Sequence, residues 1–137
     1  KIEFIEGDIR DQSVVEKAKS TGNENILVCE RGFSFGYNNL VSDMRSLVIM
    51  RETNCPVVFD ATHSTQLPGS NRDSSSGQSQ YIAPLSRAAI SVGISGIFME
   101  THPNPKEALC DGMNSLPLKD IEKLLINLKK LDEISKE

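Results

Sequence analysis

The chain has 137 residues, 38% of them hydrophobic and 25% charged, and a formal net charge of -4. This length supports one domain with its own core, and the acidic balance excludes a general nucleic-acid binder because no basic stripe could neutralise phosphates. The apolar runs are too short to span a bilayer, no signal-peptide pattern is present, and three cysteines without CxxC spacing suit a reducing compartment, so we expect a cytoplasmic protein without nucleic-acid or membrane partners.

The start of the chain predicts a strand and then a helix. Apolar and acidic residues alternate over Ile2–Ile5, which is typical of a strand. Asp11 or Ser13 can cap a helix that runs to about Ser20. Because the chain opens at Lys1, in mid-strand by this pattern and without methionine, we expect a fragment or a processed protein.

The next unit combines a buried strand with an aromatic loop. Ile26–Cys29 is apolar and predicts a strand in which Cys29 is a small core residue. Gly32–Asn39 holds glycines, asparagines and three aromatic residues, which indicates an ordered functional loop. Leu40–Arg51 has one broad apolar face and predicts a helix capped by one of the two asparagines that end the loop.

The strand Val57–Phe59 follows a proline and ends in a cluster of polar residues. Leu67–Ser79 is rich in Pro, Gly, Ser and Asn, which indicates a lid or binding loop. Tyr81–Val92 predicts a helix that is apolar on nearly all sides and therefore well buried. Ser95–Glu100 predicts the fourth strand.

A loop over His102–Asn114 and a helix from about Ser115–Pro117, with leucines every three or four residues, complete the chain. The order is four β-α units, and repeated units of this kind give a parallel α/β sheet with right-handed crossovers. Two folds compete, a small open doubly wound sheet and part of an eight-stranded barrel of about 250 residues. Four units in 137 residues fit half a barrel. Neither GxGxxG nor a P-loop follows any strand, so the main signatures of nucleotide-binding sheets are missing.

Three residues that could bind a metal follow the predicted strands. His63, Glu100 and Asp111 each lie just past a strand or in the loop after it. One imidazole and two carboxylates form a partial shell for zinc, iron or manganese. The alternative is that each has a separate hydrogen-bonding role at a loop end, since their spacing matches no compact ligand motif.

Other polar and aromatic residues near the strand ends could bind a substrate. Arg31 could hold a phosphate or carboxylate through two hydrogen bonds, or it could form a structural pair with Glu30. Gln66 could donate to a substrate oxygen, or it could be an ordinary loop residue. Phe33 could shield a substrate from water, or it could pack within its own loop. His102 could transfer a proton, or it could be a solvated loop histidine.

Several strings of the chain, in the right order, resemble the 3-deoxy-D-manno-octulosonate 8-phosphate synthase family. They include Cys29-Glu30-Arg31-Gly32, Phe35-Gly36-Tyr37-Asn38-Asn39, Asp60-Ala61-Thr62-His63-Ser64, Gln66-Leu67-Pro68-Gly69 and Phe98-Met99-Glu100-Thr101-His102-Pro103. The resemblance implies the C-terminal half of a (β/α)8 TIM barrel. It also implies an enzyme, typically a homotetramer, that condenses phosphoenolpyruvate with arabinose 5-phosphate, releases phosphate and serves lipopolysaccharide synthesis.

The resemblance also implies roles for individual residues. Arg31 matches the arginine that binds phosphoenolpyruvate, and Gln66 matches a residue near it. The resemblance places the three candidate metal ligands at three of the four metal positions of metal-dependent members. We expect His63 and Asp111 to be catalytic, and His63, Glu100 and Asp111 to hold a divalent metal (Zn, Fe or Mn). We expect substrate binding by Arg31, Gln66, Asn38 and Phe33.

The match has a clear limit. Residues 1–137 are predicted to form one partial TIM-barrel domain, in which 22–137 match the family and 1–21 are atypical. The N-terminal half of the family, with its sugar-phosphate segment, is absent, so we expect little activity from this chain alone. One alternative is a non-catalytic half-barrel module that self-associates, and another is the related synthase that uses erythrose 4-phosphate.

Overall fold

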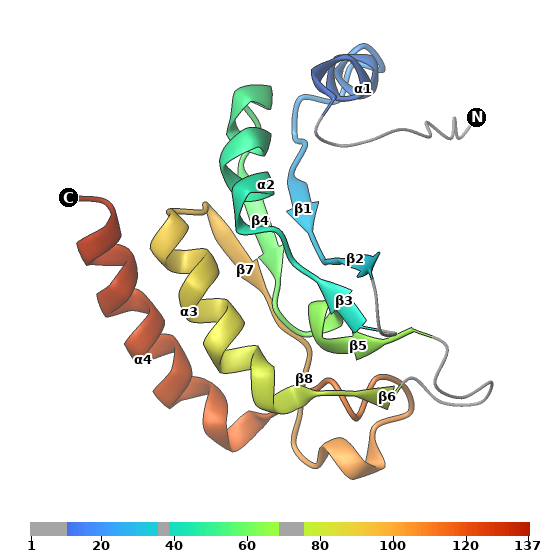
Figure 1. Cartoon of the computed structure of the whole chain (residues 1–137), viewed down its shortest axis with the longest axis vertical. Coiled ribbons are helices and arrows are strands. Elements are labelled where there is room, and N and C mark those ends of the chain that lie inside the picture. The colour runs from blue at the N-terminus through green and yellow to red at the C-terminus, as the bar shows by residue number, and fades with distance from the viewer. Residues whose placement is uncertain (1–10, 36–38, 69–75) are drawn as a thin grey trace.

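The computed structural model describes residues 11–35, 39–68 and 76–137. The predicted strand at 2–5 lies outside these residues. Figure 1 shows α2, α3 and α4 on one side of a central group of strands, with α1 beyond the start of β1. The four helices are α1 (Gln12–Lys19), α2 (Met44–Ile49), α3 (Ile82–Val92) and α4 (Leu118–Ser135).

The centre of the described fold is a three-stranded parallel sheet with the order β1-β4-β7. Its strands are β1 (Val28–Glu30), β4 (Val57–Asp60) and β7 (Gly96–Phe98). Each strand pairs with the next one of the sheet along the chain, as repeated β-α units require. The prediction of parallel strands in an α/β chain is confirmed.

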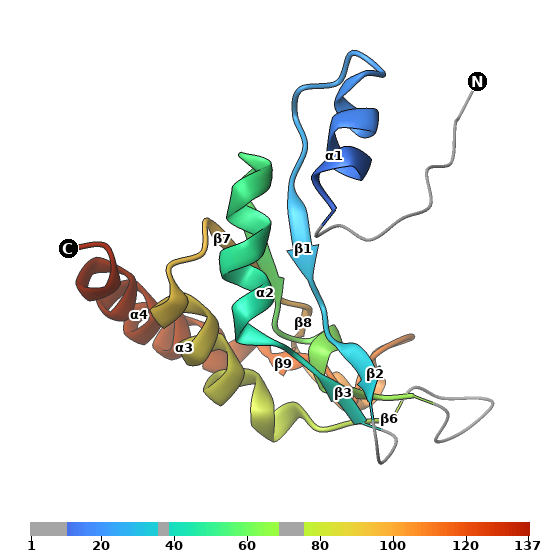
Figure 2. The same ribbon diagram turned by 45° about the horizontal axis from the view of Figure 1, so that its top comes forward.

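Short two-stranded pairs lie beyond the carboxyl ends of the sheet strands, and Figure 2 shows them at the same end of the molecule. Two pairs are antiparallel and one is parallel. They are β2 (Phe33–Phe35) with β3 (Asn39–Val41), β5 (Gln66–Leu67) with β6 (Ser76–Gly77), and β8 (Thr101–His102) with β9 (Leu116–Pro117). The segments predicted as loops therefore carry strand pairs of their own.

Side-chain caps decide where the first two helices begin. Asp11 caps α1 as predicted, with its carboxylate accepting a hydrogen bond from Ser13 N at 2.9 Å. The predicted start of the next helix is wrong. Asp43 is its cap and accepts from Arg45 N at 3.0 Å, because β3 occupies the residues before it.

The core lies between the sheet and the helices that cover it. Val57 and Phe59 of β4 are 1% and 0% exposed. They pack with Leu47 of α2, Ile82 of α3 and Leu128 of α4 in one apolar cluster. Burial of these side chains from both layers fixes the helices against the sheet.

The prediction that the 81–92 helix is buried on nearly all sides is wrong. In α3, Ile82, Ser86, Ala89 and Ile90 are buried, whereas Arg87 on the other face is exposed. Both α2 and α4 contact α3, and only its outward face stays exposed, as in an amphipathic helix.

The face of the sheet opposite the helices is largely uncovered by the described residues. Cys29, Val58 and Gly96 are in register across the three strands and share this face. Leu27 before β1 is 64% exposed, and Phe98 at the end of β7 is 45% exposed. Cys29 is exposed as well, so its prediction as a core residue is wrong. An apolar sheet face of this kind is suited to a further layer of protein.

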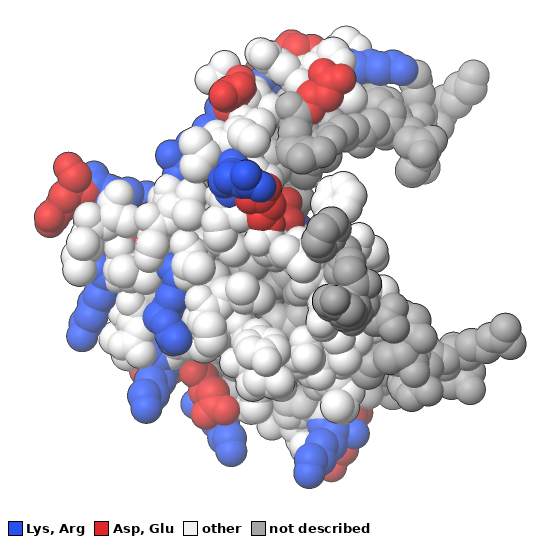
Figure 3. Space-filling view, viewed as in Figure 1, with Lys and Arg blue, Asp and Glu red and all other residues white. Residues whose placement is uncertain are grey.

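Charged side chains of both signs are interspersed on the face of the molecule that Figure 3 shows, without a continuous basic surface there. Among the helices of the described residues, none has the length and apolar character that crossing a membrane would require.

Candidate metal centre

His63 is placed by the turn that follows β4. A 3₁₀ turn over His63–Thr65 follows the strand. Asp60, the last residue of β4, accepts from the backbone N–H of His63 at 2.9 Å through Oδ1, and its Oδ2 lies 2.7 Å from Nδ1 of the imidazole. The carboxylate therefore sets both the start of the turn and the orientation of the ring.

This contact leaves the other ring nitrogen pointing toward a second carboxylate. A carboxylate is an acceptor only, so in a neutral imidazole a proton on Nδ1, facing Asp60, leaves a lone pair on Nε2. Nε2 of His63 lies 3.4 Å from Oε1 of Glu100. Two lone-pair atoms that face each other at this distance are suited to a cation between them.

Asp111 supplies the third potential ligand. One ligand atom each from His63, Glu100 and Asp111 lies within 4.8 Å of the others, and all three residues are half-buried. An imidazole nitrogen with two carboxylate oxygens fits the donor set of zinc, iron or manganese. The structure thus brings together the three residues for which the sequence predicts metal binding, and they could hold a divalent ion.

Glu100 follows β7, and a buried threonine positions its backbone. Thr62 is fully buried and its hydroxyl accepts from Glu100 N at 3.1 Å. The same hydroxyl donates to Oδ1 of Asp60 at 3.2 Å. Thr62 therefore connects Asp60, which orients His63, to the backbone of Glu100.

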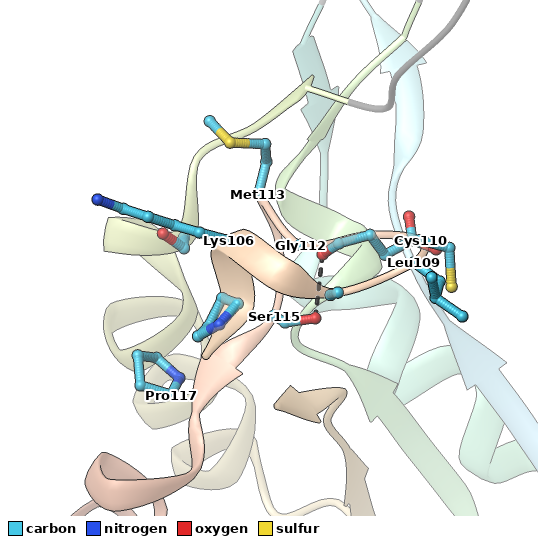
Figure 4. A pocket seen from close by; sticks show the side chains of 11 residues that line it. Lys106, Leu109, Cys110, Gly112, Met113, Ser115 and Pro117 are labelled. Carbon is cyan, nitrogen blue, oxygen red and sulfur yellow. Dashed lines mark hydrogen bonds between the residues drawn. The ribbon is translucent and has the colours of Figure 1, made fainter. Parts of the chain in front are cut away.

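Asp111 lies in a sharply turned loop. Its φ is 50°, in the left-handed region that aspartate tolerates better than most residues. Its carbonyl accepts from Ser115 Oγ at 3.0 Å and from Asn114 N at 2.9 Å, which ties the turn together. Figure 4 shows this loop around a cavity of about 540 Å³ that Asp111, Lys106 and Leu109 help to line.

Arg31 is connected to this cluster through Gln66. Nη2 of Arg31 donates to Oε1 of Gln66 at 2.9 Å, and Nε2 of Gln66 donates to Oδ1 of Asp111 at 2.9 Å. Glu30 does not pair with Arg31, because its buried carboxylate accepts from Gly32 N and from Ser46 Oγ. The guanidinium is exposed, so its remaining donors can meet an anion.

One predicted substrate residue, Phe33, is not part of this cluster in the structure. Phe33 is 67% exposed and lines a separate cavity of about 460 Å³ with Val41, Ser42 and Met44. Asn38 lies outside the described residues. His102 contacts its own loop, with Nδ1 2.7 Å from the carbonyl oxygen of Asn104.

Neither cysteine near the cluster has the character of a nucleophile. Partial burial, and then the charge of Asp60, raises the pKa of the Cys29 thiol. The neighbouring Asp111 carboxylate is the main cause of a raised pKa at Cys110. Both thiols therefore stay protonated at neutral pH, and thiolate chemistry is disfavoured.

Sequence reasoning assigned no role to Asp60 or Thr62. Their signal was present, since both stand next to His63 at the end of a strand, where supporting groups for a ligand often lie. What the sequence does not show is that one carboxylate contacts both the backbone and the ring of His63.

A family model and several curated proteins match most of this chain. The model of the DAHP synthetase I family matches residues 10–137. The chain belongs to the DAHP synthetase I family. The match begins inside the 1–21 segment that the sequence analysis set apart.

The curated relatives of this DAHP synthetase I chain carry the name 2-dehydro-3-deoxyphosphooctonate aldolase. The protein of Legionella pneumophila (strain Corby) is 66% identical over 123 residues, which are 90% of this chain and 45% of the relative. The protein of Francisella tularensis subsp. mediasiatica is 66% identical over 125 residues, which are 91% of this chain and 46% of the relative. The protein of Xanthomonas campestris pv. campestris is 65% identical over 123 residues, which are 90% of this chain and 45% of the relative.

This name denotes the 3-deoxy-D-manno-octulosonate 8-phosphate synthase, so the family resemblance predicted from the motifs is confirmed. The chain spans about half the length of the curated relatives it matches.

We expect Asp60→Asn to weaken metal binding by about 10- to 100-fold, the usual effect of removing an outer partner of a ligand histidine. The asparagine keeps the shape but loses the negative charge that holds Nδ1–H of His63. Calorimetric titration with Zn²⁺ or Mn²⁺ measures the effect, and circular dichroism checks the fold. Asp120→Asn, at an exposed position on α4, is the matched control. Equal affinities in the two variants would contradict this role of Asp60.

Proposed function

We propose that this chain supplies the metal-binding part of the active site in an enzyme that condenses phosphoenolpyruvate with D-arabinose 5-phosphate. The products are 3-deoxy-D-manno-octulosonate 8-phosphate and phosphate, and the reaction would serve lipopolysaccharide synthesis. The observation that carries the proposal is the His63, Glu100 and Asp111 cluster, connected through Gln66 to Arg31. The names of relatives at 65–66% identity support the choice of reaction.

The proposed roles follow from what each group can bind. Arg31 has a planar set of donors that suits the carboxylate or phosphate of phosphoenolpyruvate. His63, Glu100 and Asp111 would hold the divalent ion, with His63 and Asp111 next to the reacting groups. When bound, such an ion polarises a carbonyl or makes a bound water more acidic. Asn38 and Phe33 remain proposed substrate contacts on the resemblance alone.

The reaction joins C3 of phosphoenolpyruvate to the aldehyde carbon of the sugar phosphate, while water adds to C2 and phosphate leaves. Two anionic reactants must lie side by side, which requires cationic groups and an oriented, enclosed site. The exposed guanidinium of Arg31 can offset the charge of one of them. The second phosphate would be held by parts of the barrel that this chain does not span.

We also propose that the chain forms half of a (β/α)8 barrel. The exposed Leu27 and Phe98 lie on the sheet face opposite the helices, where a barrel has its interior. The chain covers 45–46% of its relatives, which fits four of eight units. By family resemblance, the completed enzyme would be a cytoplasmic homotetramer.

A chimera with the N-terminal half of the Legionella relative tests the function. We expect phosphate release from phosphoenolpyruvate that depends on arabinose 5-phosphate, and little release from the 137-residue chain alone. The same chimera with His63→Ala is the matched control. A chimera that is folded and binds metal but releases no phosphate would overturn the proposed reaction. Robust turnover by the chain alone would overturn the half-barrel proposal. Competition with erythrose 4-phosphate separates the reaction from that of the related synthase.

The second candidate is a non-catalytic module that self-associates, and the uncovered sheet face favours it. In that case the chain alone would form oligomers by light scattering, and phosphoenolpyruvate would not raise its melting temperature. A monomer that phosphoenolpyruvate stabilises would exclude this candidate.

A further inference from the structure

Gln66 is the residue through which the candidate anion site contacts the candidate metal site. Gln66 is in β5, and its side chain contacts Arg31, which follows β1, and Asp111 in the loop before β9. The two hydrogen bonds of its amide are both 2.9 Å long. The three side chains thus form one continuous hydrogen-bonded series.

The chemistry of the partners fixes the orientation of the amide. A guanidinium has only donors and an ionised carboxylate has only acceptors, so Oε1 of Gln66 must face Arg31 and Nε2 must face Asp111. A glutamate here would place a carboxylate against Asp111, and an apolar side chain would contact neither partner in this way. A carboxamide offers the acceptor and the donor that these two partners require.

A side chain held at both ends transmits order from one end to the other. An anion on Arg31 restricts the guanidinium, and thereby the amide and the carboxylate of Asp111, before a metal arrives. The metal then loses less conformational freedom on binding, which raises its affinity. By linkage, the metal must strengthen anion binding by the same factor.

We propose that Gln66 is a positioning residue that couples phosphoenolpyruvate binding at Arg31 to metal binding at Asp111, so that each ligand strengthens the other. The identity of the anion rests on the proposed function. Coupling of this kind typically amounts to about 5- to 150-fold in affinity. Both binding groups and their connection belong to this chain, and the chimera with the N-terminal half of the Legionella relative supplies the rest of the barrel, so that chimera is the material for the test.

The test is calorimetric titration of this chimera, carrying the wild-type chain or a variant of it, with Mn²⁺, with and without saturating phosphoenolpyruvate, and the reverse titration. We expect the wild-type chain to bind Mn²⁺ at least about fivefold more tightly with phosphoenolpyruvate present. In Gln66→Met we expect the factor to fall below about twofold, whatever the change in each separate affinity, because both hydrogen bonds are gone. Gln80→Met, at an exposed position, is the matched control and keeps the wild-type factor.

A second variant separates positioning from a merely structural role. Gln66→Glu keeps an acceptor for Arg31 but sets a carboxylate against Asp111, so we expect Mn²⁺ binding to weaken more than phosphoenolpyruvate binding. Loss of both ligands together with the circular dichroism signal in both Gln66 variants would show that the residue only supports the fold, and would overturn the inference.

The outcomes also separate this inference from the proposed function. If both ligands bind the wild-type chain independently, or if the factor persists in Gln66→Met, the coupling is refuted and the proposed reaction stands. If phosphoenolpyruvate gives no binding isotherm with the wild-type chain, the assignment of Arg31 to this anion falls, and the coupling falls with it.

Discussion

Replacing His63 by alanine should lower the affinity for Zn²⁺ or Mn²⁺ by more than the roughly 100-fold that marks loss of an outer partner. The variant removes the Nε2 lone pair that faces Glu100 and leaves two carboxylates as the only members of the cluster. It also leaves Asp60 without the ring that it contacts. In the completed enzyme, turnover should fall with the metal content.

The matched control is the other histidine of the chain. His102→Ala removes an imidazole that contacts its own loop, so metal affinity should stay within about threefold of the wild type. Cobalt is a suitable probe, because its visible absorption changes when an imidazole is lost from its coordination shell. Equal turnover in metal-free and metal-loaded chimera would refute the metal role of His63.

Gly77→Ala should destabilise the fold by about 1–3 kcal/mol, the range for overpacking a filled site, and should displace β6 from the loop that follows Asp111. A Cβ at this position would overlap Oδ1 of Asn114 and lie 3.0 Å from the carbonyl oxygen of Met113. Asn114 is 0% exposed and cannot swing into solvent to make room. The cause is steric, since the φ of Gly77 is outside the left-handed region.

Gly96→Ala is the matched control for this effect. A Cβ there meets the Val58 side chain at 3.7 Å, which is ordinary contact. Urea unfolding followed by circular dichroism gives the free energy of unfolding of both variants. A Gly77→Ala variant as stable as Gly96→Ala, with unchanged metal affinity, would show that β6 and the Asn114 loop need not lie in contact.

The elements of the sheet could be predicted because their signals are local. Pro56 followed by three apolar residues marks β4, and the leucine spacing marks α4. The hairpin of β2 and β3 was missed. Phe33, Ser34 and Phe35 do alternate as strands do, but their pairing partner begins at Asn39, and only the pairing distinguishes a strand from an ordered loop.

The candidate site was predictable in its members but not in its connections. Strand ends and motif resemblance point to His63, Glu100 and Asp111. The bond between Gln66 and Asp111 joins residues 45 positions apart, and no local pattern specifies it. Glu30 likewise accepts a hydrogen bond from Ser46 of α2, a contact that depends on how the helix packs on the sheet. The sequence therefore left open whether Glu30 pairs with Arg31.

The matching order of the sheet strands in space and along the chain has a consequence for biosynthesis. Every partner strand in the described sheet comes from the next β-α unit, about thirty to forty residues away. As the polypeptide leaves the ribosome, each new unit can therefore dock onto one that has already emerged. Nothing in the described sheet has to wait for a distant segment, which favours stepwise growth of this layer during translation.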